Sequence, residues 1–162
     1  MEKLTYLDVI DIALNLSNEA KNFYESLLKE IEEEDKRQLL SWLLQNERKY
    51  LEEFNHIKSK VCDLKAIDDV ICDDPRVVNF IKFIVEDRAL KKANIADLNS
   101  KIKDFQSILH LAIQNKKDRM AYFRELKDQI KDKDALVTLE QVIEKERESL
   151  IELYRKLNEL YK

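Results

Sequence analysis

Five polar side chains occupy positions where the sequence otherwise places the apolar residues of a core. Glu47, Lys116 and Glu146 each lie at the centre of an apolar helical face. Arg119 lies one turn after Lys116, and Ser17 interrupts a fourth face. A buried charge is costly unless it is ion-paired or bound to a metal. These residues therefore predict either a carboxylate metal site or a buried salt bridge. For Arg119, an edge position from which its long side chain reaches water is the alternative.

Four long amphipathic helices must position these residues. Apolar residues recur at helical spacing in four runs of the sequence. The runs cover about residues 7–31, 39–61, 105–130 and 136–160. Acidic residues 32–35 and the DKD stretch at 132–134 predict short turns, so the runs form antiparallel hairpins over about 5–62 and 104–161. Thr5 with Asp8 predicts a capping box, and Asp104 is a candidate N-cap.

The two hairpins are joined by residues 63–103, which are numerous enough to run back along the helices. Within this crossover, Asp74 and Pro75 predict the start of a short helix that continues from about Arg76 to Asp87. The fold class we expect is therefore all-α. It is a single domain over 1–162, an antiparallel four-helix bundle with a long crossover between the second and third helices. Ferritin-like proteins have this connectivity.

Composition restricts the possible functions. The 162 residues include no Gly and one Pro, which excludes Gly-rich phosphate-binding loops, and 38% of them are charged. The net charge of −4 and the lack of a long basic run predict no nucleic-acid binding. No stretch is apolar enough for a membrane span or a signal peptide. Cys62 and Cys72 match no common metal or redox spacing, and we expect idle thiols and a cytoplasmic location, with a disulfide as the alternative.

The two hairpins also resemble each other. A shift of 99 positions, without gaps, places the pair Glu47-Arg48 on Glu146-Arg147 and aligns several apolar positions of the paired helices. This register favours an internal duplication. The alternative is that any two amphipathic hairpins of equal length would align as well.

Four segments resemble rubrerythrin-related ferritin-like proteins. ALNLSNEAKNFYESL (13–27) and LLQNERKYLEEF (43–54) are similar to the first helix pair of that family. LAIQNKKDRMAYFREL (111–126) and VIEKERESLIEL (142–153) are similar to the second pair. The resemblance implies a site for two iron or manganese ions, with a Glu from each of the first and third helices and a Glu-x-x-His from each of the second and fourth.

Carried over by position, only Glu47 and Glu146 match the family's ligands, as the glutamates that bridge the two metals. Tyr50 and Ser149 stand at the two histidine positions. The other departures from the ligand set lie on the first and third helices. Ser17 and Lys116 replace the glutamates there, and Arg119 replaces a further carboxylate found in some relatives.

These replacements predict a metal-free, salt-bridged core. The cations of Lys116 and Arg119 would take the place of the metal ions between the two glutamates, and a metal would meet repulsion from Lys116. We expect the Tyr50 hydroxyl to hydrogen-bond one glutamate. The two histidines of the chain, His56 and His110, lie off the motif positions, and we expect them at the surface. An alternative alignment would use Glu19 and Asp118 as ligands, but neither lies centrally on its apolar face.

We expect a protein that has lost the di-metal centre, uses no cofactor and serves as a scaffold or binds a partner, with a homodimer as the expected assembly. The alternative is a di-iron or di-manganese oxidoreductase of the rubrerythrin or ferroxidase type, acting on peroxide or ferrous iron. That alternative lacks a Cys-x-x-Cys pair to relay electrons. A third interpretation makes Lys116 a catalytic amine, although paired glutamates would keep it protonated.

Overall fold

The computed structural model describes residues 3–63, 70–86, 105–130 and 133–160. Within these ranges the protein is all-α apart from one short two-stranded sheet. The helices are α1 (Tyr6–Glu30), α2 (Glu34–Asp63), α3 (Pro75–Glu86), α6 (Phe105–Lys127) and α7 (Lys133–Glu159), and the strands are β1 (Leu4–Thr5) and β2 (Val70–Cys72).

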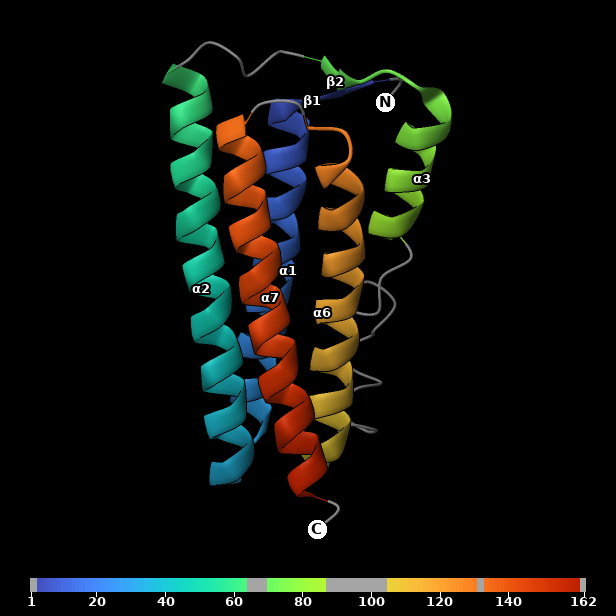
Figure 1. The fold of residues 1–162 in the computed structure, drawn as a ribbon. Helices are drawn as coiled ribbons and strands as arrows, with labels where there is room; N and C mark the ends of the chain where they lie inside the picture. Colours follow the sequence, from blue (N-terminus) through green and yellow to red (C-terminus); the bar gives the residue numbers. More distant parts are fainter. Residues whose placement is uncertain (1–2, 64–69, 87–104, 131–132, 161–162) are drawn as a thin grey trace.

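The four long helices lie side by side, as two antiparallel hairpins (Figure 1). α1 pairs with α2, and α6 pairs with α7. The end of α2 and the start of α6 lie at opposite ends of the molecule, so these two helices run in the same direction (Figure 1). The connection between them therefore joins opposite ends of the molecule. α3 belongs to this connection and packs against α6.

Two helix starts follow the predicted local chemistry. The Thr5 hydroxyl accepts a hydrogen bond from the backbone N–H of Asp8, and the Asp8 carboxylate accepts one from the backbone N–H of Thr5. This is the predicted capping box of α1. At α3, Asp74 Oδ1 accepts from the backbone N–H of Arg76, and Pro75 occupies the first helical position. Asp87 and Asp104 lie outside the described residues.

The turns differ slightly from the prediction. Glu34 and Asp35 form the first turn of α2, although the acidic stretch was expected to lie wholly in the connection. Carboxylates at a helix N-terminus interact favourably with its exposed N–H groups, so the helix can begin within the acidic run. At the other turn, α6 ends at Lys127 and α7 begins at Lys133.

The two-stranded sheet was not expected from the sequence. β1 pairs with β2 in antiparallel orientation, with Leu4 opposite Cys72. Strands this short carry no detectable periodicity, and residues far apart in the chain form the pair. Cys72 is a buried, free thiol, as expected. The side chain of Cys62 lies outside the described residues.

The core consists of two apolar clusters. One contains residues around Tyr24, Leu40 and Leu109, and the other contains residues around Ala13, Phe54 and Phe123. On every long helix the two clusters are separated along the chain by one polar layer. No helix in the described ranges has both the length and the apolar character that a membrane crossing requires.

Thr5→Ala tests the cap of α1. Loss of the hydroxyl leaves the Asp8 N–H without its acceptor, and we expect the free energy of unfolding to fall by about 1 kcal/mol. Urea denaturation measures this change. Gln45→Ala, at an exposed position of α2, is the control. Equal stability of the Thr5 variant and the wild type would show that the cap contributes nothing.

Candidate functional site

The polar layer between the two apolar clusters is built by all four long helices. α1 contributes Ser17, α2 contributes Glu47, α6 contributes Lys116 and Arg119, and α7 contributes Glu146. Each of these residues is at most 1% exposed. The two cations are three residues apart on one helix, which places them on the same face.

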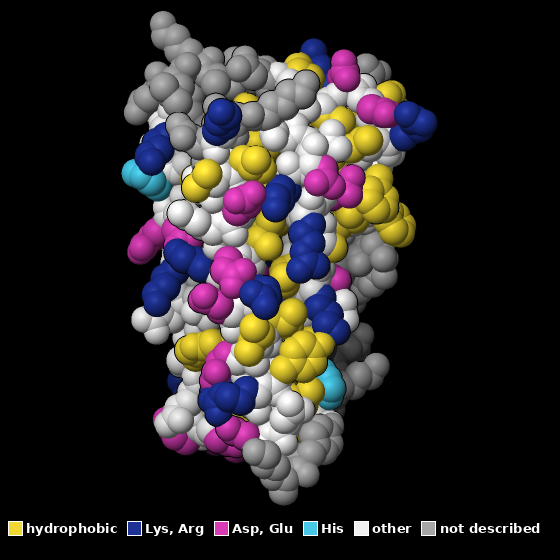
Figure 2. Space-filling model, viewed as in Figure 1, with side chains coloured by type: hydrophobic (Ala, Val, Ile, Leu, Met, Phe, Trp, Pro, Cys, Tyr) yellow, Lys and Arg dark blue, Asp and Glu magenta, His cyan; other side chains and the backbone are white. Residues whose placement is uncertain are grey.

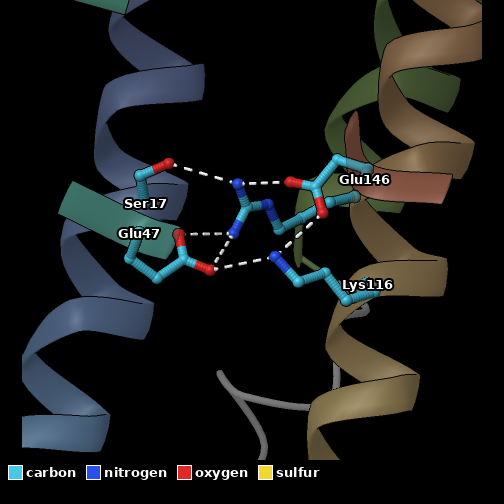
Figure 3. A network of polar contacts seen from close by, with 5 residues as sticks. Ser17, Glu47, Lys116 and Glu146 are labelled. Carbon is cyan, nitrogen blue, oxygen red and sulfur yellow. Dashed lines mark hydrogen bonds and ion pairs between the residues drawn. The ribbon is translucent and has the colours of Figure 1, made fainter. Parts of the chain in front are cut away.

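Arg119 joins both glutamates (Figure 3). Its Nη1 donates to both carboxylate oxygens of Glu47, each at 2.6 Å. Its Nη2 lies 2.6 Å from Oε1 of Glu146 and also donates to Oγ of Ser17, at 3.3 Å. The planar guanidinium thus presents two nitrogens to two carboxylates from different helices, a geometry that a lysine could not reproduce.

Lys116 forms a second bridge between the same carboxylates (Figure 3). Its Nζ lies 3.0 Å from Oε2 of Glu146 and 3.4 Å from Oε1 of Glu47. The layer therefore contains two positive and two negative charges, and its formal charge is zero. The salt-bridged arrangement that the sequence predicted is present, and Arg119 is buried in it rather than at a helix edge.

The aromatic ring of Tyr50 contacts both cations of the site. Nζ of Lys116 lies 4.8 Å from the ring centroid, and Cζ of Arg119 lies 5.0 Å from it. An aromatic face attracts cations, so the ring adds to the electrostatic stabilisation of both. Ser149 lies beside the Tyr50 hydroxyl and opposes the rise of its pKa, whereas a glutamate was the expected partner.

The contacts of the site favour the charged forms of Glu47 and Arg119. Burial alone would raise the pKa of Glu47, but the charges of Arg119 and Lys116 and their hydrogen bonds outweigh it and lower that pKa. Burial alone would lower the pKa of Arg119, and the charges of Glu146 and Glu47 raise it above its ordinary value. Burial and the charge of Glu146 raise the pKa of Tyr50, so its hydroxyl stays neutral.

Two neighbours of the site were not singled out from the sequence. Asn115 is 2% exposed, and Tyr24 is 1% exposed. Burial and the negative charge of Glu47 raise the pKa of Tyr24, and the charge of Arg119 and the adjacent Asn115 amide oppose this rise. Asn115 lies three residues after Ala112 and four before Arg119, so its spacing places it on the buried face of α6. This spacing is the feature of the sequence from which the burial of Asn115 could have been predicted.

The residues of the alternative alignment lie apart from the polar layer. Glu19 is exposed, and the partly buried Asp118 accepts a hydrogen bond from Gln114 on the outer side of α6. His56 and His110 are exposed, as expected.

The residues present do not fit a pair of metal ions. Both glutamates are held by cations, and Lys116 would repel a metal between them. The remaining ligand positions hold hydroxyl groups, which are weaker ligands for iron or manganese than imidazole or carboxylate. Within the described part of the chain, no group of three or more His, Cys, Asp or Glu side chains could hold a metal ion.

Comparison of the chain with family models, with curated proteins and with solved structures finds no match. Any inference about function therefore depends on the geometry of the site and on the order of the helices.

Arg119→Leu tests the energetic role of the site. The variant leaves two buried carboxylates with one cation, and we expect the free energy of unfolding to fall by about 3–5 kcal/mol. Urea denaturation measures the change, and Arg124→Leu at an exposed position of α6 is the matched control. A loss of less than about 1 kcal/mol, typical of surface ion pairs, would contradict a coupled buried network.

Glu47→Gln tests the pH dependence. Because folding lowers the pKa of Glu47 below its ordinary value of 4.5, the stabilisation is present above about pH 4.5 and is lost as the pH falls through the lower folded-state pKa. The stability difference between wild type and Glu47→Gln should therefore shrink below that pH. Urea denaturation between pH 3 and 7 measures it, with exposed Glu52→Gln as the control. A difference that does not change with pH would contradict the assignment.

Proposed function

We propose that this chain is a rubrerythrin-related ferritin-like four-helix bundle in which side-chain cations have replaced the two metal ions, and that it acts without catalysis as a scaffold or partner-binding protein. One observation carries the proposal: the Lys116 ammonium lies between Glu47 and Glu146, at 3.4 and 3.0 Å. These are the two positions that the family resemblance assigns to bridging ligands.

The connectivity supports the family part of the proposal. Two antiparallel hairpins, with the second and third long helices running in the same direction, require one crossover as long as the bundle (Figure 1). Ferritin-like proteins have one such crossover, whereas simple up-and-down bundles have none. The polar layer also lies at mid-height, between two apolar clusters, where a bundle of this family holds its metals.

The electrostatics support the non-catalytic part. Redox chemistry at a di-metal centre requires metal ligands and an open coordination position, and here the carboxylates are already neutralised by Lys116 and Arg119. The same pairing argues against Lys116 as a catalytic amine, because a nucleophilic lysine must lose its proton. Full burial also separates its Nζ from any substrate in solvent.

The proposed assembly is a homodimer, as the family resemblance implies. On the face shown in Figure 2, Lys and Arg side chains alternate with Asp and Glu side chains over α2 and α7, without a region of one sign. Light scattering of the purified chain measures its mass in solution. A monomer at all concentrations would rule out the homodimer and leave binding to a different protein.

Metal loading tests the absence of a di-metal centre. The purified chain, incubated with ferrous iron or Mn²⁺ and then desalted, should retain far less than one ion per chain, because Lys116 and Arg119 already neutralise both glutamates. Elemental analysis measures the retained metal. Two retained ions per chain, together with peroxide turnover that is lost in Glu47→Ala, would establish the oxidoreductase alternative.

Rebuilding the ligand set provides the complementary experiment. One variant combines five substitutions: Ser17→Glu, Tyr50→His, Lys116→Glu, Arg119→Ala and Ser149→His. It removes both cations and supplies the missing carboxylates and imidazoles, so it should bind two iron ions. The matched control keeps Arg119 and should bind iron more weakly, because the guanidinium still neutralises Glu47 and Glu146. A folded five-substitution variant that takes up no iron would show that the family register is wrong.

A further inference from the structure

α3 lies outside the array of four long helices and packs against α6 (Figure 1). Its Val78 and Ile81 are buried in the apolar cluster that includes Phe123 of α6. Helical spacing of about 100° per residue gives α3 a second side, opposite to these two residues. We call this side the outer face of α3. It consists of five exposed residues: Arg76, Asn79, Phe80, Phe83 and Glu86.

Two phenylalanines occupy the middle of the outer face. Phe80 is 50% exposed, and Phe83 is 61% exposed. The other four phenylalanines of the chain are buried or partly buried. Figure 2 shows hydrophobic side chains gathered over α3. Single exposed apolar residues are common, whereas two aromatic rings one turn apart form a patch of the kind found at protein–protein contacts.

Opposite charges lie at the two ends of the outer face. Arg76 is in the first turn of α3, and Glu86 is its last residue. The third charged residue of the helix, Lys82, is partly buried at its flank. The Arg76 side chain is 91% exposed, and its ion pair with Asp74, at 3.0 Å, lies at the surface. Because surface ion pairs contribute little, the Arg76 guanidinium can also contact a second carboxylate.

This pattern of charges is complementary to itself in one orientation. When two copies of α3 lie antiparallel across a two-fold axis, each presents the same patch to the other. Arg76 and Glu86 are each five residues from Ile81. An axis at Ile81 therefore sets Arg76 of each copy opposite Glu86 of the other and brings the phenylalanines together between two ion pairs. A parallel arrangement would place like charges opposite each other.

We propose that the outer face of α3 binds the outer face of α3 in a second copy of this chain, with the two helices antiparallel. The inference rests on the homodimer of the proposed function and specifies the surface that forms it. A helix of 12 residues is about 18 Å long and 10 Å wide, so its outer face is smaller than the roughly 800 Å² per partner of a stable interface. The dimer is therefore reversible, and its fraction rises with protein concentration.

Phe83→Glu tests the aromatic contact. A carboxylate at the centre of the interface would lose its hydration, so we expect the dissociation constant of the dimer to rise at least about tenfold. Sedimentation velocity of the full chain over a concentration series up to about 1 mM measures this constant. Ile151→Glu is the matched control on α7, where the side chain is 56% exposed, and it should preserve the dimer. Circular dichroism establishes that each variant is folded.

Arg76→Glu and Glu86→Arg test the orientation. An acid at the start of a helix and a base at its end interact favourably with the helix dipole, so both variants should fold. Each variant alone places like charges opposite each other and should dimerise about fivefold more weakly than the wild type. An equimolar mixture of the two should recover the wild-type affinity, because opposite charges face each other at both ends of the mixed dimer.

Three results would overturn the proposal: a Phe83→Glu variant that dimerises like the wild type, an Ile151→Glu variant that weakens the dimer as much as Phe83→Glu does, or a mixture of the two charge variants that associates no better than either alone. The first two of these results would leave the proposed homodimer in place on a different surface. A wild type that is monomeric at every concentration would overturn both the α3 contact and the homodimer. Metal retention is measured separately, so the metal-free core stands or fails independently of this surface.

Discussion

The interaction on which the centre of this protein depends is the pairing of two glutamates with a lysine and an arginine inside an apolar core. Each charge alone would be strongly disfavoured there, because the core cannot replace the hydration that the group loses. Together they are formally neutral, and each carboxylate contacts both cations. The stability of any one member therefore depends on the other three.

This dependence constrains how the helices can pack. Arg119 reaches α1, α2 and α7 from α6, so its contacts are satisfied only when all four long helices are in register. Apolar packing above and below the layer tolerates small shifts more readily than a charge network does, since it has no directional requirement. The layer thus selects one arrangement of the helices.

The two glutamates of this layer can either bind metal ions or pair with side-chain cations, but they cannot do both. Carboxylates that hold a metal must be free of competing cations, whereas carboxylates that hold Lys116 and Arg119 order the core without a metal. When the two hairpins are aligned with a shift of 99 residues, Lys116 aligns with Ser17 and Arg119 aligns with Ala20. Both cations therefore belong to the second hairpin, and the first has no cation at these positions. The two hairpins match in their glutamates and differ in the residues that neutralise them.

Much of this protein could be predicted from its sequence. The helical spacing of apolar residues and the absence of glycine predicted four long helices, and Thr5 with Asp8 predicted where the first begins. These features could be read from the sequence because each involves residues within one or two helical turns of one another. The burial of Glu47, Lys116 and Glu146 followed from the same periodicity. Tertiary structure alone decided that Arg119 enters the core, that the Tyr50 ring faces the cations, and that β1 pairs with β2. These outcomes depend on which helices are neighbours and how far each side chain reaches, and spacing within one helix holds no information on either.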